Sequence, residues 1–241
     1  METKETSRGW EAVGRLDIDR SGFCTAALIS ETTILTAAHC LFDDQGARIP
    51  PDRFTFLAGL RDGRAAAIRA VIRATPHPDY VHHGTRARND AVSVDLAVLE
   101  LDRPIRLPSL APYAVGAAPT RDVPLTVVSY ARDRANVASL QKTCHVLDAI
   151  SHVVMMTCAA DFGASGAPVF ATVDGIARIV AVLSAKGEAD GAAVSLAATV
   201  SGTLDTVLTA HRDGQAPLVS PGPRFTSSGA RHDTGAKFVR P

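Results

Sequence analysis

Short apolar runs separated by turn residues recur along most of the chain and predict β-strands. The runs are rich in Val, Ile, Leu and Thr, and Gly, Pro and Asp residues separate them. Regularly spaced short strands favour antiparallel barrels or a sandwich, because a parallel α/β sheet would place helical segments between its strands. We therefore predict an all-β protein. The predicted strands are residues 11–18, 23–29, 32–36, 53–59, 66–73, 95–101, 125–130, 144–149, 152–158, 168–172, 176–184 and 193–199.

Helical periodicity is scarce and is clearest over residues 201–212. Ser201 or Thr203 can cap the start of this helix, because a hydroxyl oxygen accepts a hydrogen bond from a free N–H of the first turn. The side chains predicted to share one face are Leu204, Val207, Leu208 and His211.

A stretch with several chain breakers, residues 107–121, separates two strand-rich halves and predicts the crossover between two β units. We expect an N-terminal half over residues 1–112, and a C-terminal half that includes the helix over residues 113–212. Residues 213–241 have little periodic apolar character, many breakers and several positive charges. This composition predicts a disordered tail that is loosely attached.

The composition allows a substantial buried core and names no partner. Of the 241 residues 46% are hydrophobic, and 25 basic residues balance 25 acidic ones. The net charge therefore favours neither nucleic acid nor an anionic membrane. The sequence has no apolar run of about 18 residues, the length that predicts a membrane-spanning helix, so we expect no membrane insertion.

The four cysteines form two local pairs, Cys24 with Cys40 and Cys144 with Cys158. A disulfide in either pair would close a loop of roughly 15 residues and contribute about 3 kcal/mol in the chain-entropy model. Disulfides persist in oxidising compartments, so we expect a secreted or periplasmic protein whose export signal was removed before Met1. Four buried free thiols in a cytosolic protein are the alternative.

A histidine follows a predicted strand that ends in small residues, in the sequence LTAAHC over residues 35–40. Small residues let the backbone turn tightly beside His39. A neutral imidazole with a fixed tautomer can take a proton from a hydroxyl and return it to a leaving amine, which contributes roughly 10²- to 10⁴-fold in rate. By itself, an ordinary buried or surface histidine explains this residue better.

An aspartate opens an otherwise apolar predicted strand, in the sequence DLAVLEL over residues 95–101. Burying its carboxylate without a partner would be costly. A hydrogen bond from an imidazole would compensate that cost and would orient the ring. Asp90 and Asp102 are nearby competitors, but the first is in a predicted loop and the second closes the strand, so Asp95 is the better candidate.

A serine lies between glycines immediately ahead of a predicted strand, in the sequence GASGAP over residues 163–168. Glycine permits backbone conformations that a β-carbon excludes. Such a turn can direct the amides of Gly163 and Ser165 toward one point as an oxyanion hole, a feature whose loss costs about 2.7 to 4 kcal/mol. Alone, this segment would be explained as a plain glycine-rich turn.

Together, TAAHC, DLAVLEL and GASGAP resemble, in order and spacing, the three signature segments of the chymotrypsin/trypsin-like serine peptidases. The resemblance covers about residues 10–212 and implies His39, Asp95 and Ser165 as a catalytic triad. It also implies two six-stranded antiparallel β-barrels with the active site between them, the disulfides Cys24–Cys40 and Cys144–Cys158, and a closing C-terminal helix. The segment HPDY, residues 77–80, resembles a family loop, so we interpret His77 as structural.

The chain departs from the family signature Gly-Asp-Ser-Gly-Gly-Pro at two positions, Ala164 and Ala167. In trypsin-like enzymes the aspartate receives the new N-terminal ammonium after activation, and Ala164 cannot do so. We expect a preformed oxyanion turn, as in the bacterial branches that this chain resembles, or a substitute contact, for which Asp161 is a candidate.

The resemblance also places the substrate-binding surface. Ala159 and Ala160 should form the floor of the primary pocket, where they offer no carboxylate for a basic substrate side chain. Ser184 should support Asp95, and its strand should pair with a peptide substrate. Lys186 replaces a glycine, and it either narrows the pocket, attracts an acidic residue or is an ordinary solvated lysine. The full predicted set is Ala159, Ala160, Phe162, Ser184, Ala185 and Lys186.

The leading hypothesis is a serine endopeptidase that hydrolyses polypeptides through an acyl-enzyme intermediate and needs no cofactor. The alternative is a catalytically silent or latent protein of the same fold that acts as a binding or regulatory module, motivated by Ala164, Lys186 and the tail. A zinc site built from Cys24, His39 and Cys40 would lack a fourth ligand, so we expect no metal.

Overall fold

Antiparallel strands make up most of the structure, as the strand pattern predicts. The computed structural model describes residues 7–19, 22–82, 89–132, 134–159, 162–189 and 191–214. In this part of the chain the strands form a closed barrel and a second sheet, with helices confined to short segments and one C-terminal helix. The all-β prediction is thus confirmed.

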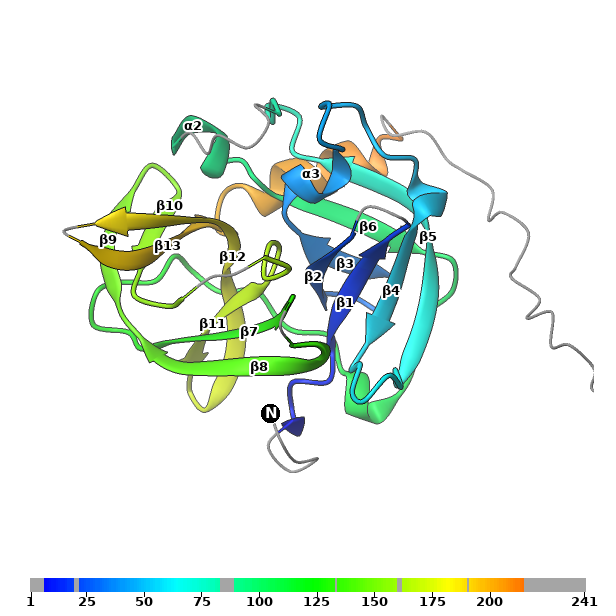
Figure 1. Ribbon diagram of the computed structural model, residues 1–241, viewed down its shortest axis with the longest axis horizontal. Helices are drawn as coiled ribbons and strands as arrows, with labels where there is room; N and C mark the ends of the chain where they lie inside the picture. The colour runs from blue at the N-terminus through cyan, green and yellow to red at the C-terminus, as the bar shows by residue number, and fades with distance from the viewer. Residues whose placement is uncertain are drawn as a thin grey trace, which may run out of the picture.

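The first half forms a closed barrel in the order β1-β2-β3-β6-β5-β4 (Figure 1). Alternation along the strands directs one set of side chains inward, which is clearest in β4, where Phe54, Phe56 and Ala58 are buried. The strands are β1 (Val13–Ile18), β2 (Gly22–Leu28), β3 (Thr33–Thr36), β4 (Phe54–Ala58), β5 (Ala67–Pro76) and β6 (Ala97–Leu101).

The second half forms an antiparallel sheet in the order β8-β7-β11-β12-β13-β10-β9. Its strands are β7 (Leu125–Ala131), β8 (Arg134–Cys144), β9 (Val146–Ile150), β10 (Val153–Met156), β11 (Pro168–Val173), β12 (Ile176–Ala189) and β13 (Ala192–Thr199). The sequence did not predict β8, because its residues RANVASLQKTC form no continuous apolar run. It is nevertheless a strand, because its backbone pairs with β7.

Short helices and irregular backbone connect these strands. The helices are η1 (Ala38–Leu41), η2 (Pro51–Arg53), α2 (Asn89–Val92), η3 (Pro108–Leu110) and α3 (Leu204–Arg212). The predicted crossover, residues 107–121, has η3 as its helix and meets the second sheet at a bridge between Val115 and Ile179. Of the predicted tail, only residues 213 and 214 are described, and the rest lies outside the described residues.

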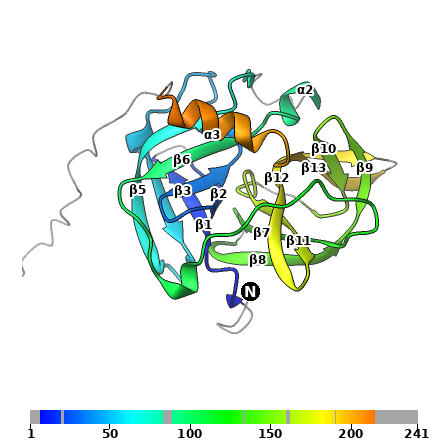
Figure 2. The same ribbon diagram turned by 180° about the vertical axis from the view of Figure 1, so that it is seen from behind.

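The C-terminal helix α3 follows the second sheet in sequence but packs against β5 and β6 of the first barrel (Figure 2). Its His211 is buried, and the ring Nδ1 lies 2.8 Å from the Thr75 hydroxyl. The Arg73 guanidinium donates a hydrogen bond of 2.9 Å to the His211 carbonyl. The helix start has no side-chain cap, because the Thr203 hydroxyl donates to the Thr199 carbonyl instead.

The N-terminal segment makes the reciprocal contact with the second half. Trp10 packs edge-on against Phe170 of β11 at 4.9 Å between ring centroids. Tyr113, from the crossover, contacts the same ring at 4.8 Å. Each end of the described chain therefore lies against the opposite half, which holds the two halves together.

Buried hydrogen bonds also join the halves directly. The Tyr130 hydroxyl of β7 donates to the Leu60 carbonyl of the first half at 2.9 Å. The Thr25 hydroxyl of β2 accepts the Tyr130 N–H at 3.0 Å and donates to the Gly163 carbonyl at 2.9 Å. These bonds fix the segment around Gly163 against the first barrel.

Both predicted cysteine pairs are disulfides, Cys24–Cys40 in the first half and Cys144–Cys158 in the second. No helix among the described residues combines the length and hydropathy needed to cross a membrane.

Tyr130→Phe should lower the free energy of unfolding by about 1–3 kcal/mol, because the buried Leu60 carbonyl loses its donor. Tyr113→Phe is the matched control, since its hydroxyl donates to the Gly9 carbonyl at an exposed site where water can replace it. Urea denaturation of both variants measures the difference. Equal losses would contradict a special role for the buried bond.

Candidate active site

The histidine His39 is held by the short helix η1, which directly follows β3. The small residues Ala37 and Ala38 are fully buried, and this lets the backbone turn out of the barrel at this point. The His39 N–H donates a hydrogen bond of 2.8 Å to Asp95 Oδ1. The ring Nδ1 lies 2.7 Å from Asp95 Oδ2. Backbone and side chain of one residue are thus fixed by a single carboxylate.

Asp95 lies in the irregular segment between α2 and β6. The strand begins at Ala97, so the prediction that Asp95 opens it was wrong by two residues. The reason is that the Asp95 N–H closes a turn onto the Val92 carbonyl instead of pairing with a neighbouring strand. The carboxylate is 3% exposed, and Oδ2 also accepts a hydrogen bond from the Ser184 hydroxyl of β12. The contact that the family resemblance implies for Ser184 is therefore present.

The two side chains shift each other's pKa. Burial alone would raise the pKa of the Asp95 carboxyl, but the charge and hydrogen bonds of His39, with that of Ser184, bring it below its ordinary value. Burial likewise disfavours a charged His39, but Asp95 outweighs it and raises the pKa of the imidazole. Because Asp95 stays ionised, Nδ1 of a neutral His39 carries the proton and Nε2 is left as the basic nitrogen.

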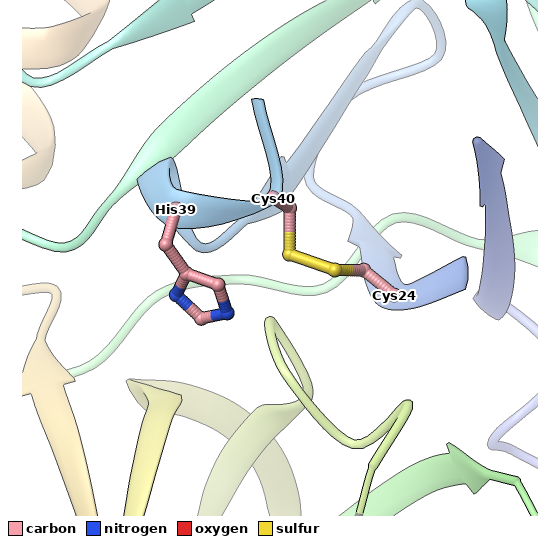
Figure 3. A group of neighbouring side chains, drawn as sticks. All are labelled: Cys24, His39 and Cys40. Carbon is pink, nitrogen blue, oxygen red and sulfur yellow. A yellow bond between two sulfur atoms is a disulfide. The ribbon is translucent and has the colours of Figure 1, made fainter. Parts of the chain in front are cut away.

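The Cys24–Cys40 disulfide lies beside the His39 ring (Figure 3). Ligand atoms of Cys24, His39 and Cys40 lie within 4.8 Å of one another, which is the cluster considered above as a zinc site. The two sulfurs are bonded to each other, and a metal site would need them as thiolates. The disulfide instead ties the His39 segment to β2.

Ser165 lies in a tight turn that is bonded to β2. The Thr25 N–H donates to the Ser165 carbonyl at 2.8 Å, and Thr25 directly follows the bonded Cys24. The Gly166 N–H donates to the Leu183 carbonyl at 2.8 Å, next to Ser184. These hydrogen bonds connect the Ser165 turn to two other segments. One is β2, which the disulfide joins to the His39 segment, and the other is the part of β12 that contains Ser184.

Glycine is required on both sides of this serine. Gly163 and Gly166 have φ angles of +95° and +77°, which favour glycine. A β-carbon at Gly163 would overlap the Phe23 ring, and one at Gly166 would overlap the Thr36 hydroxyl and the Thr25 carbonyl. The turn therefore needs glycine for its conformation and for its close approach to the first barrel.

The backbone of the turn offers amide donors for an oxyanion. Within the described residues, the amides of Gly163 and Ser165 donate no hydrogen bond. Ala164 between them is 2% exposed and belongs to the core of the second half, where Ala167 also packs. The candidate substitute Asp161 lies outside the described residues.

Residues 21–182 match the trypsin-like peptidase domain family. The chain belongs to the trypsin-like peptidases. A solved structure described as "Structure of Glu endopeptidase in complex with MPD" has the same fold, with a TM-score of 0.70 and 16% sequence identity. The match covers 88% of this chain and 96% of that one. The match supports the fold expected from the resemblance, and the described part of the first half is the expected closed six-stranded barrel. Among its described residues the second half forms a seven-stranded sheet, so the expectation of six strands there was wrong.

The predicted pocket of this trypsin-like peptidase is described in part. The backbone of Ala159 makes two hydrogen bonds with the Gln141 side chain of β8, at 2.9 and 2.6 Å. The Ser195 hydroxyl of β13 donates to the adjacent Cys158 carbonyl at 2.6 Å. Neither Gln141 nor Ser195 was predicted, because no local pattern marks a polar side chain that binds backbone far away in sequence. Ala160 lies outside the described residues.

The other predicted pocket residues border the same region. Phe162 is 57% exposed and immediately precedes the Ser165 turn. Ala185 and Lys186 follow Ser184 on β12, and Lys186 pairs directly with Ser195 on β13. The described pocket residues therefore come from one loop and one strand that lie side by side.

Competing candidates lie elsewhere or have structural partners. Asp102 is beyond the other end of β6, where its N–H bonds the Ala70 carbonyl, and the side chain of Asp90 lies outside the described residues. His77 is buried, and its Nδ1 accepts the Asp79 N–H at 3.2 Å. Burial lowers the pKa of His77, with the Asp79 charge opposing it. These contacts agree with a structural interpretation of His77.

Gly166→Ala should destabilise this trypsin-like peptidase more than Gly175→Ala does. Both glycines have a φ of +77°, but a β-carbon at Gly175 meets nothing within 4 Å. The control should therefore lose only the cost of the backbone conformation, about 1–2 kcal/mol. Overlap with Thr36 and Thr25 should add about 1–3 kcal/mol at Gly166. Chemical denaturation measures both, and equal losses would contradict the close packing of the turn.

Proposed function

We propose that this trypsin-like peptidase is a serine endopeptidase whose triad is His39, Asp95 and Ser165. The observation that carries the proposal is the double bonding of His39 to the buried Asp95 carboxylate, which fixes both the ring orientation and its tautomer. The basic Nε2 is thereby directed away from Asp95. The Ser165 turn, joined to the same segments through Thr25 and Leu183, supplies the hydroxyl.

In the acylation step, Ser165 Oγ forms a bond with the substrate carbonyl carbon while its proton passes to His39 Nε2. The carbonyl oxygen becomes an oxyanion that the amides of Gly163 and Ser165 bind. The C–N bond then breaks, and His39 returns the proton to the leaving amine. Asp95 remains ionised throughout and stabilises the transient imidazolium.

In the deacylation step, water attacks the acyl-enzyme ester and gives a proton to His39. The ester bond breaks, the proton returns to Ser165 Oγ, and the carboxylic acid product leaves. No cofactor enters either step. The two available amides contribute electrostatic stabilisation of the oxyanion, worth about 2.7 to 4 kcal/mol for a single donor.

We propose that the oxyanion turn is preformed and needs no N-terminal ammonium. Three backbone hydrogen bonds support this: Thr25 N–H to Ser165, Gly166 N–H to Leu183, and Ala167 N–H to Ala164. Ala164 fills an apolar site, so no buried charge has to be neutralised there. The two disulfides further favour an extracytoplasmic location for the protein.

A fluorophosphonate probe should label Ser165 in the oxidised protein, and the protein should cleave casein. Ser165→Ala should abolish labelling and lower the cleavage rate by at least about 10⁴-fold, because the nucleophile is lost. Peptide mass spectrometry locates the probe. A folded, oxidised protein that binds peptides without labelling or cleavage would favour the silent binding module instead.

The pH profile of cleavage should have an acidic limb above the ordinary histidine pKa of 6.5, because Asp95 raises the pKa of His39. Cleavage needs neutral His39, so kcat/KM falls as pH drops through that raised pKa. Asp95→Asn should move the His39 titration to lower pH, measured by NMR, and reduce the rate about 10⁴-fold.

Asp102→Asn is the control for this experiment, since Asp102 lies beyond the opposite end of β6 and should leave the His39 titration unchanged. An Asp95→Asn protein whose His39 titrates as in the wild type would refute the proposed coupling.

A further inference from the structure

Two cations lie over one exposed aromatic ring beside the Ser165 turn. The Lys186 ammonium is 4.3 Å from the centroid of the Phe162 ring, and the Arg132 guanidinium carbon is 4.8 Å from it. The Arg132 N–H also donates to the Phe162 carbonyl at 2.8 Å. Attraction between a cation and the face of an aromatic ring restricts where these flexible side chains end. The positive charge of both side chains is therefore held at Phe162, three residues before the candidate nucleophile.

The strand pairing places the Lys186 side chain over the predicted pocket. Lys186 is directly opposite Ser195 in the antiparallel pair of β12 and β13, so the two side chains lie on the same face. Ser195 donates to the Cys158 carbonyl on that face, and Ala159 follows Cys158. Lys186 then reaches Phe162. Its side chain thus extends from β12 across to the segment that leads into the Ser165 turn.

The described pocket residues other than Lys186 are uncharged. Ala159 and Ala185 are small and apolar, and Phe162 is aromatic. A substrate side chain that enters here meets these apolar side chains and the positive charge of Lys186 at their edge. An ammonium is a compact charge that binds a carboxylate strongly through charge-assisted hydrogen bonds.

We propose that Lys186, positioned by Phe162, selects peptides with an acidic side chain immediately before the scissile bond. The inference rests on the proposed peptidase function and adds its substrate class. The Arg132 guanidinium, which also lies over the Phe162 ring, adds to the positive charge at the same place. The substrate carboxylate binds the Lys186 ammonium, and no step of the chemistry changes.

The test uses two peptides that differ only in Glu or Gln before the scissile bond. The wild type should cleave the Glu peptide with a kcat/KM about tenfold higher, the size expected for a charge-assisted hydrogen bond. Lys186→Met should collapse the Glu-to-Gln ratio toward one, and Lys186→Glu should reverse it. Added salt should also lower the ratio, because ions screen exposed charges.

Lys142→Met is the matched control, because Lys142 is an exposed lysine on β8 and should leave the ratio at its wild-type value. Phe162→Leu keeps an apolar side chain but removes the aromatic face, and should lower the ratio about threefold as the ammonium becomes less localised. An unchanged ratio in Lys186→Met, or a wild-type ratio near one, would overturn the proposal.

A second measurement separates this inference from the peptidase function. Ser165→Ala protein should bind a peptide that ends in Glu about tenfold more tightly than one that ends in Gln, measured by calorimetry. This preference does not need turnover. Probe labelling with no Glu preference would refute the inference alone, and Glu-selective binding without any labelling of the wild type would refute the peptidase function alone.

Discussion

The buried Asp95 carboxylate is the constraint on which the candidate site depends. A charge with 3% exposure is stable only if its hydrogen bonds replace those it made to water. The replacements come from the His39 backbone, the His39 ring and the Ser184 hydroxyl, which lie on η1 and β12. Because Ser184 belongs to the second sheet, satisfying this one carboxylate requires both halves to be assembled. The hydrogen bonds of the Asp95 carboxylate therefore both join the two halves and orient the His39 imidazole.

The position of the Ser165 turn depends on the absence of a side chain at two glycines. Gly163 lies against the Phe23 ring, and Gly166 lies against β2 and β3 closely enough that a β-carbon would overlap backbone. Thr25 adds hydrogen bonds to this packing. Its N–H donates to the Ser165 carbonyl, and its hydroxyl bonds both Tyr130 and Gly163. Hydrogen bonds and close glycine packing against the first barrel thus fix the position of the turn.

Local signals in the sequence predicted most of the strands and both disulfide pairs. They also singled out the three segments that contain His39, Asp95 and Ser165. Strand β8 was missed because its polar sequence lacks an apolar run, although backbone pairing with β7 makes it a strand. The bonds of Gln141 to Ala159 and of Tyr130 to Leu60 join residues far apart in the chain, and hydrophobic periodicity carries no information about them. The same holds for α3, whose apolar face was predictable while its partner, the opposite barrel, was not.

Ala164 shows how this fold can order its central turn without a charge. A carboxylate there would need a cationic partner to offset the cost of its desolvation. The turn would then be ordered only when that partner is bound. A buried alanine needs no such partner, because burial of its methyl group is favourable by itself. The N-terminal segment is then available for another role, and Trp10 packs on Phe170 together with Tyr113 from the crossover. In this molecule the segment around Trp10 packs where the two halves meet, while hydrogen bonds from the first barrel hold the turn.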